Sequence, residues 1–192
     1  ATTYRADGLP QAVTGPRGEA TSYTYDSYGN PATITRTDGG METRTWNARG
    51  DLLTLTDANT NTTTYTYDKR RLLTSVRDPF QQRITNIYNN AGLLMTNIDK
   101  RNGTNITAYT PTHKVASIRY PDGGTVSNFY DAADRLVRVR DPLGFTATNQ
   151  YDLAGRLTRV ADPLGNAVSN AYDAAGNLLS VRDAAGNVFS NQ

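Results

Sequence analysis

The stretch YDLAGRLTRVADPLGNAVSNA, residues 151–171, decides the fold, because Tyr172 and Asp173 begin a second copy of it at once. Stepping by 21 residues in both directions reaches an aromatic residue nine times, with no insertion or deletion: Tyr4, Tyr25, Trp46, Tyr67, Tyr88, Tyr109, Tyr130, Tyr151 and Tyr172. The chain has only 12 Tyr, 1 Trp and 4 Phe among 192 residues, so chance does not explain this regularity. We therefore expect one array of nine tandem 21-residue repeats over residues 1–192.

Composition argues against several classes of protein. Apolar residues make up 37% of the chain, below the usual ~45–50%, which favours thin layers over one thick core. The formal net charge of +2 comes from dispersed arginines, so nucleic-acid binding has little support. The chain contains no cysteine and hence no disulfide frame or thiolate metal site. No apolar run approaches the ~20 residues of a membrane span, so none is expected.

The repeat, numbered from its aromatic residue, has two places for the motif Asp-x-x-Gly, about ten residues apart, and the repeats that begin at Tyr151 and Tyr172 carry both in full. The first aspartate stands at position 2 and the second at position 12, as in Asp152 and Asp162, with glycine three places later at Gly155 and Gly165. Asp at the first place of a type I turn accepts bonds from the turn backbone, and Pro suits the second place. A glycine in the left-handed region completes a type I turn with a G1 bulge. We therefore predict positive φ at Gly155 and Gly176, and a loss of about 1 kcal/mol or more on substitution by Ala.

The segments between the turns have the pattern of strands. The first carries apolar residues at positions 7 and 10, as in Leu157 and Val160, and this spacing of three predicts a β-bulge. The second alternates, with Val168, Asn170 and Tyr172 on one face and small or polar residues on the other. No window has the 3.6-residue period of an amphipathic helix. The predicted fold class is all-β, with negligible helix.

Nine hairpins give up to eighteen antiparallel strands. Open sheets rarely exceed ~10 strands without curling, and strands twist by roughly 20–25° each, so we expect a spiralling β-strip that forms a shell, tube or fibre. Equivalent columns then form ladders. One holds Tyr130, Tyr151 and Tyr172, another Leu136, Leu157 and Leu178, and a polar one Asn86, Asn128, Asn149, Asn170 and Asn191.

The repeated motif resembles the YD repeat of Rhs proteins, of toxin-complex shell subunits and of teneurins. It is carried by "YDLAGRL", "YDAAGNL", "YDAADRL" and "YDSYGNP", and the resemblance extends over all 192 residues. Arg71, His113 and Asp134 stand where the family usually has Gly. The resemblance implies an antiparallel strip wound into a hollow shell that encloses a toxic segment, or a surface module for which carbohydrate binding has been proposed. Nothing after Asn187 resembles the family's self-cleaving core.

No residue is predicted to be catalytic, cofactor-binding or metal-binding. His113, the only histidine, falls in a turn column, which favours a solvated loop residue over a general base. The aspartates recur from turn to turn, as structural residues do, and the nine-residue calcium-binding repeat is absent, so neither a glycosidase pair nor calcium ligation is favoured. Tyr and Trp ladders could stack on sugars if they faced outward, and packing is the preferred interpretation.

The favoured function is that of a non-enzymatic structural scaffold, part of a hollow shell or an extracellular fibre, with a carbohydrate-binding or adhesive surface module as the alternative. Expected partners are flanking repeats of the same chain or further copies end to end, together with an enclosed toxin segment or glycans. The location implied by the resemblance is bacterial, extracellular or at the cell surface. Both ends of the sequence fall at the same phase of the repeat, as in an excerpt of a longer array. Exposed strand edges then predict that the 192 residues alone aggregate or add end to end.

Overall fold

The computed structural model describes residues 1–190 and divides the chain into two compact units, Ala1–Gly103 and Thr104–Gln192. Both are built from antiparallel strands alone, so the all-β prediction is confirmed. No helix among residues 1–190 has the length and apolar character needed to cross a membrane.

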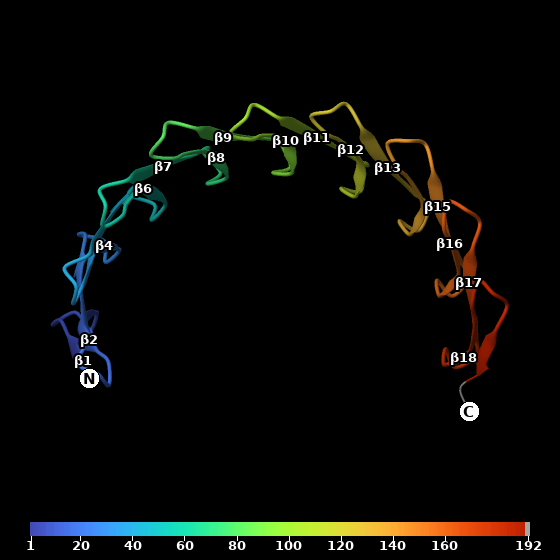
Figure 1. Ribbon diagram of the computed structural model, residues 1–192, viewed down its shortest axis with the longest axis horizontal. Helices are drawn as coiled ribbons and strands as arrows, with labels where there is room; N and C mark the ends of the chain where they lie inside the picture. The colour runs from blue at the N-terminus through green and yellow to red at the C-terminus, as the bar shows by residue number, and fades with distance from the viewer. Residues whose placement is uncertain (191–192) are drawn as a thin grey trace. The chain divides into compact units, whose positions relative to one another are not determined.

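The first unit has ten strands, each hydrogen-bonded to the next along the chain (Figure 1). They are β1 (Thr2–Tyr4), β2 (Pro10–Thr14), β3 (Ala20–Tyr25), β4 (Pro31–Arg36), β5 (Met41–Trp46), β6 (Leu52–Thr56), β7 (Thr62–Tyr67), β8 (Leu73–Arg77), β9 (Arg83–Tyr88) and β10 (Leu94–Ile98).

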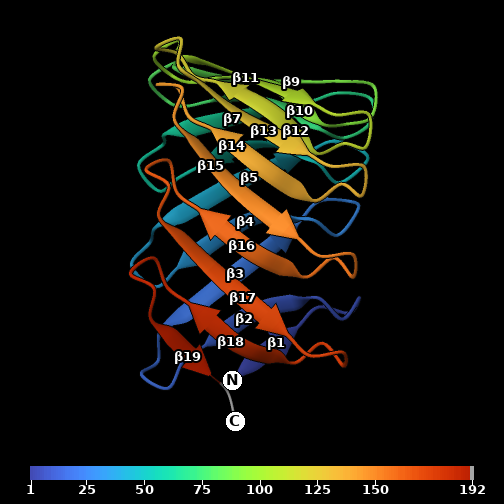
Figure 2. The same ribbon diagram turned by 90° about the vertical axis from the view of Figure 1, so that its right-hand side faces the viewer.

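The second unit has nine strands within the described residues, again paired in chain order, and Figure 2 shows β14 to β18 side by side. They are β11 (Thr104–Tyr109), β12 (Val115–Arg119), β13 (Thr125–Tyr130), β14 (Leu136–Arg140), β15 (Thr146–Tyr151), β16 (Leu157–Ala161), β17 (Ala167–Tyr172), β18 (Leu178–Arg182) and β19 (Val188–Ser190).

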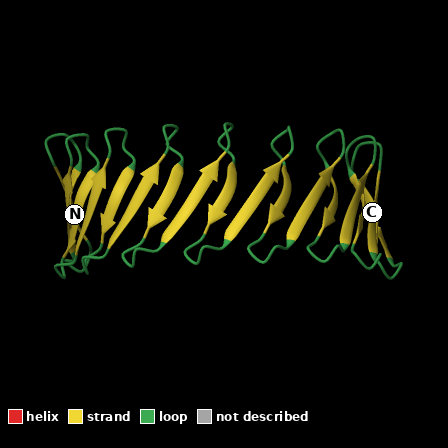
Figure 3. Ribbon diagram, turned by 90° about the horizontal axis from the view of Figure 1, so that it is seen from above, coloured by secondary structure: helices red, strands yellow, loops and turns green. Residues whose placement is uncertain are grey.

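The turns run along both long edges of each unit (Figure 3) and have the predicted geometry. In the turn after β15, the Gly155 amide donates to the Asp152 carbonyl at 3.0 Å and the Asp152 amide donates to the Arg156 carbonyl at 3.0 Å. This is the bond pattern of a type I turn followed by a G1 bulge. Gly155 has φ 81° and Gly176 has φ 93°, so the predicted positive φ is confirmed at both.

The same turn is kept where glycine is replaced. Within residues 1–190, six non-glycine residues have positive φ, and all of them occupy the two glycine columns: Thr60, Arg71, Gln81, Asn102, His113 and Asp134, with φ between 58° and 69°. The left-handed conformation is costly for L-residues, most of all for a β-branched side chain such as that of Thr60. The turn geometry is therefore imposed by the flanking strands as well as by the residue.

The predicted β-bulge lies where the spacing of apolar residues placed it. Tyr172 pairs with Leu178, and Ala171 pairs with Ser180, which leaves Leu179 without an opposite residue. The same shift recurs in the hairpins that end at Tyr130 and Tyr151. This extra residue returns positions 7 and 10 to one face of the sheet.

Each unit has two chemically different faces. Direct cross-strand pairs put Tyr151, Leu157, Val160 and Val168 on one side, which we call the tyrosine face. The opposite side, which we call the hydroxyl face, carries threonines and serines in adjacent strands, such as Thr43, Thr33, Thr54 and Thr64 in the first unit and Thr148 and Ser169 in the second.

There is no thick core. Among the described residues the only buried apolar residue is Ala161 and the only buried charged residue is Asp51, and no large side chain is fully buried. A one-layer sheet with a half-buried tyrosine face explains why 37% apolar residues suffice.

Candidate functional site

The polar atoms of the tyrosine face meet at the junction between successive repeats. The ladder between β16 and β17 stops at Arg159 and Ser169, so the Leu157 carbonyl has no backbone partner there. The Tyr172 hydroxyl donates to that oxygen at 2.9 Å, and the Asn170 Nδ2 donates to it at 3.0 Å. Asn170, which belongs to the same repeat as Leu157, and Tyr172, the first residue of the next repeat, thus use both lone pairs of the Leu157 carbonyl.

This arrangement, which we call the repeat seam, recurs along both units. Paired Tyr and Asn donors reach the carbonyls of Leu73, Val115 and Leu136 at 2.9–3.0 Å. The Trp46 indole N–H donates to the Pro31 carbonyl at 2.8 Å in the same way. The aromatic column contains Tyr and Trp but no Phe, because Tyr and Trp both carry a donor. The ladders are predicted from the sequence, but these hydrogen bonds are not. The sequence pattern that could have indicated these bonds is a pair of residues with polar ends, Asn and Tyr, two positions apart on one face of a strand.

Asn191 and any seam bond that it makes lie outside the described residues. Within them, the predicted Tyr and Leu columns are adjacent, since Tyr130, Tyr151 and Tyr172 each lie opposite a leucine.

Arginines add a second connection between repeats at the position-6 column. Arg156 Nε donates to the Asp152 carboxylate at 2.6 Å, its Nη1 donates to the Asp173 carbonyl at 2.7 Å, and its guanidinium lies 5.0 Å from the centre of the Tyr172 ring. Arg135 repeats these contacts with the next hairpin. One side chain therefore binds its own turn, the next turn and the aromatic ring.

Asp51 occupies the arginine column in the first unit and reverses the charges. It is 8% exposed and accepts from Asn47 Nδ2 at 2.9 Å and from Arg71 Nε at 2.6 Å. The Asn47 hydrogen bond, followed by the hydrogen bond and charge of Arg71, holds the pKa of Asp51 below its usual range. This pairing explains why a bulky arginine stands in a glycine column.

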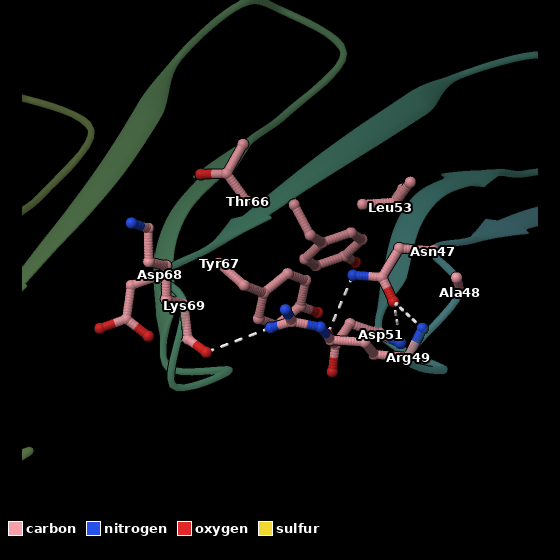
Figure 4. Close-up of a pocket in the computed structure, with 10 residues that line it drawn as sticks. Asn47, Ala48, Arg49, Asp51, Leu53, Thr66, Tyr67, Asp68 and Lys69 are labelled. Atoms are coloured by element: carbon pink, nitrogen blue, oxygen red, sulfur yellow. Dashed lines mark hydrogen bonds between the residues drawn. The ribbon is translucent and has the colours of Figure 1, made fainter.

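A groove of about 510 Å3 lies beside this pair (Figure 4). It runs between the turn at Asn47 and the turn at Lys69, and the Arg49 guanidinium connects these turns by donating to the Lys69 carbonyl at 3.1 Å. Tyr65 and Tyr67 line its wall. Burial, and then the negative charge of Asp51, raise the pKa of Tyr67. The groove can hold a small polar molecule against aromatic rings.

The turn aspartates are bound to their own turns. Asp162 Oδ1 accepts from the amides of Leu164 and Asn166 at 2.9 and 2.8 Å, and its Oδ2 accepts from Asn166 Nδ2 at 2.8 Å. The Asn166 bonds hold the pKa of Asp162 below its usual range, and Asp173 and Asp183 have the same arrangement with Asn177 and Asn187. Within residues 1–190 no three His, Asp or Glu side chains gather as metal ligands. His113 is an exposed turn residue whose amide donates to the Thr110 carbonyl at 3.0 Å.

The family follows from a comparison with family models. The RHS repeat model matches residues 4–41, 46–83, 130–167 and 151–188, which together make up more than half of the chain. The chain belongs to the RHS repeat family. No curated protein matches it.

Among solved structures, the RHS repeat chain is similar to a Photorhabdus luminescens Tc holotoxin pore, with 14% identity, a TM-score of 0.57 and coverage of 99% of this chain and 15% of that one. The chain is also similar to two structures of a TcdB2–TccC3 complex. One lacks the hypervariable C-terminal region and has a TM-score of 0.51, and the other is described simply as TcdB2–TccC3 and has a TM-score of 0.50. In both cases the identity is 14%, and the match covers 92% of this chain and 12% of that chain. At this identity the likeness shows the fold alone. The chain spans less than a sixth of each of these proteins.

Proposed function

We propose that this RHS repeat chain is a non-enzymatic scaffold that forms a section of wall in a larger hollow shell. The observation that carries the proposal is the repeat seam, in which Tyr172 of one repeat joins Asn170 in completing the hydrogen bonding of the Leu157 carbonyl in the preceding repeat. Because each repeat is completed by its neighbour, stability grows by nearest-neighbour contacts and the strip extends without a separate core.

The use of the polar groups supports a structural role over an enzymatic one. Catalytic carboxylates need lone pairs directed at a substrate, whereas those of Asp162, Asp173 and Asp183 accept bonds from their own turns. The repeated hydroxyls and amides of the tyrosine face are likewise bound to seam carbonyls. These side chains maintain the shape of the strip.

The partners proposed for the scaffold are flanking repeats or further copies at its ends and a polypeptide enclosed by the shell. The similar folds of the Tc holotoxin pore and the TcdB2–TccC3 complex support this choice by analogy of fold. The same analogy supports a location outside the bacterial cell or at its surface.

Electron cryomicroscopy of the protein at its natural length tests the proposal. The expected result is a continuous strip of hairpins that closes around an interior holding additional polypeptide density. A strip that stays open and extended in every particle class would support the fibre form of the scaffold instead. A compact enzyme domain packed over the groove at Asn47 would contradict both.

The groove at Tyr65 and Tyr67 supports one alternative, a carbohydrate-binding surface, because aromatic rings beside amide and carboxylate groups suit a sugar ring. A glycan array with the purified chain tests it, with Tyr65→Asn as the matched variant, since Asn is the usual residue of that column. Glycan binding that the variant loses would favour this function, and an array without signal would remove it.

A further inference from the structure

Charge is segregated between strands and turns in the second unit. Over the described strands β11 to β19, no residue is acidic, and the only charged residues are arginines: Arg119, Arg138, Arg140, Arg159 and Arg182. The aspartates of this unit all lie outside the strands, in or beside the turns. The near-neutral net charge of the chain therefore conceals a local excess of positive charge on the strands.

The five arginines lie on one side of the sheet. Residues that pair directly across two antiparallel strands point to the same side, and Arg138 pairs with Thr148, Arg159 with Ser169, and Ser169 with Arg182. Arg140 pairs with Ser127 and Arg119 pairs with Thr125, and Ser127 and Thr125 are two residues apart on β13, so both arginines lie on the same side. We call this part of the hydroxyl face the arginine face.

The guanidinium groups of the arginine face have no carboxylate partners. The ion pairs of the second unit, within the described residues, are Arg135–Asp131 and Arg156–Asp152, both at the turns. Arg138 lies 3.7 Å from the centre of the Phe129 ring, and four of the five arginines are exposed, with Arg159 half-buried. An unpaired arginine keeps all five of its N–H donors for a ligand.

Two shallow grooves on this face have the same construction 42 residues apart. Ser127, Arg140 and Asp141 line a groove of about 260 Å3, and Ser169, Arg182 and Asp183 line one of about 340 Å3. The two aspartates lie at the groove margin, where each accepts a backbone bond from its own turn, from Phe145 and Asn187 respectively. Each groove thus has a guanidinium group and a hydroxyl group among its lining side chains.

The spacing of the arginines identifies the ligand. Arginines on β12, β14, β16 and β18 are two strands apart, which is about 10 Å at ~4.8 Å per strand. An extended polypeptide in the polyproline II conformation has three residues per turn and rises about 3.1 Å per residue, so every third side chain points to the same side and recurs at about 9 Å. We propose that the arginine face binds an extended polypeptide that crosses the strands and carries Asp or Glu at about every third residue. Paired guanidinium–carboxylate bonds supply the affinity.

The same face is poorly suited to single-stranded nucleic acid. Such ligands require aromatic side chains on which bases stack, and the Phe129 ring is covered by the Arg138 guanidinium. The proposal does not depend on the scaffold function, because it concerns the side of the sheet opposite the repeat seam.

The test is fluorescence anisotropy on the whole 192-residue chain with a labelled 15-residue Ser/Thr peptide that carries Glu at every third position. The variant R138T/R140T/R159T should raise Kd at least tenfold. Threonine already occupies these columns at Thr33, Thr35 and Thr54, so the variant is expected to fold, and circular dichroism checks this. The matched control R17T/R101T/K114T removes the same charge from exposed turn residues and should leave Kd within twofold.

The comparison ligands decide between this proposal and its rivals. A peptide of the same composition with its Glu residues clustered at one end should bind at least fivefold more weakly. Equal weakening by both triple variants would reduce the effect to net charge and overturn the proposal. Tighter binding of a 15-nucleotide oligo-dT or of heparin than of the spaced peptide would overturn it in favour of a nucleic acid or a sulfated polysaccharide.

Discussion

At the scale of the residue, the turn columns place side chains in a backbone region that most of them disfavour. Thr60 has φ 66° in a column where Gly165 has φ 90°, and the Thr60 amide still donates to the Asp57 carbonyl at 3.0 Å. The flanking ladders hold the turn against the cost of a Cβ in the left-handed region, which is ~1–2 kcal/mol. The residue in this column therefore changes the stability of the turn, while the flanking strands of the repeat determine its geometry.

Replacing Thr60 by Gly should stabilise the protein. Removing the strain of a β-branched side chain in the left-handed region outweighs the added freedom of glycine in the unfolded chain. We expect the free energy of unfolding, measured with urea, to rise by about 0.5–1 kcal/mol. The matched control is Gly165→Ala in the same column, where an added Cβ meets nothing within 4 Å. That change should cost about 1 kcal/mol from backbone strain alone. Equal and negligible effects at both sites would show that the turn conformation carries no strain.

Replacing Tyr151 by Phe should separate packing from hydrogen bonding at the repeat seam. The ring stays, while the bond from the hydroxyl to the Leu136 carbonyl at 3.0 Å is lost. Asn149 still donates to that carbonyl at 3.0 Å, so we expect a loss of about 0.5–1.5 kcal/mol in urea unfolding, the range for one hydrogen bond. The double variant with Asn149→Ala should lose more than the two single variants together, because the carbonyl is then left without a donor. If the loss in the double variant equals the sum of the two single losses, the Leu136 carbonyl does not act as an acceptor shared by Tyr151 and Asn149.

The turn aspartates predict a fall in stability under acid conditions. Asn166, Asn177 and Asn187 lower the pKa values of Asp162, Asp173 and Asp183 below the ordinary 3.8. A lowered pKa in the folded state stabilises the protein above the ordinary value, and this contribution is lost as the pH falls through the folded-state pKa. We expect a constant free energy of unfolding from pH 7 to about 5 and a decline below about pH 4.

The pH dependence has a control in the sequence. Asn47 already serves in an aspartate column, where its Oδ1 accepts from the amides of Arg49 and Asp51. The triple variant D162N/D173N/D183N keeps these acceptors without a titrating group. Its stability should change less between pH 5 and pH 3 than that of the unmodified chain, and an unchanged slope would assign the pH dependence to other groups.

At the scale of the element, the local features could be predicted from the sequence, whereas those that depend on strand register could not. The two turns, the bulge and the alternating second strand were predicted because each is encoded within five or six residues. The seam bond to Leu157 was not predicted, because it depends on where the β16–β17 ladder stops. The arginine face was missed for the same reason: the bulge sets whether the column of Arg138 and Arg159 lies on the tyrosine face or on the opposite side.

Deleting one whole repeat should be tolerated better than deleting one strand. Removal of residues 151–171 joins Gln150 to Tyr172 and keeps every column in place, whereas removal of residues 157–166 deletes β16 with its turn and reverses the strand direction beyond it. We expect a loss of a few degrees in melting temperature for the first, since ~1 kcal/mol corresponds to roughly 2–4 °C in a chain of this size. The shorter deletion should cost at least twice as much. Equal losses would contradict the hairpin pair as the structural unit.

At the scale of the whole molecule, neighbour contacts take the place of a core. Only Ala161 and Asp51 are buried among the described residues, while each repeat is connected to the next by strand pairing and side-chain donors. Extending such a strip needs no new packing solution. The two faces are therefore free to differ in chemistry without disturbing the fold, with tyrosines and seam bonds on one and hydroxyls or arginines on the other.

The last prediction concerns the strand edges. β1 pairs with β2, β19 pairs with β18, and the residues of β1 and β19 are exposed throughout. An exposed strand edge is a template for further pairing, and a charge placed on it opposes that pairing. We expect the 192-residue chain made alone to associate with rising concentration in sedimentation velocity. The variant T3K/V188K should shift it toward monomer, while the control L143K/L164K, which adds the same charge at exposed turn residues, should not. A concentration-independent monomer of the unmodified chain, or equal effects of the two variants, would show that association does not proceed through the edges.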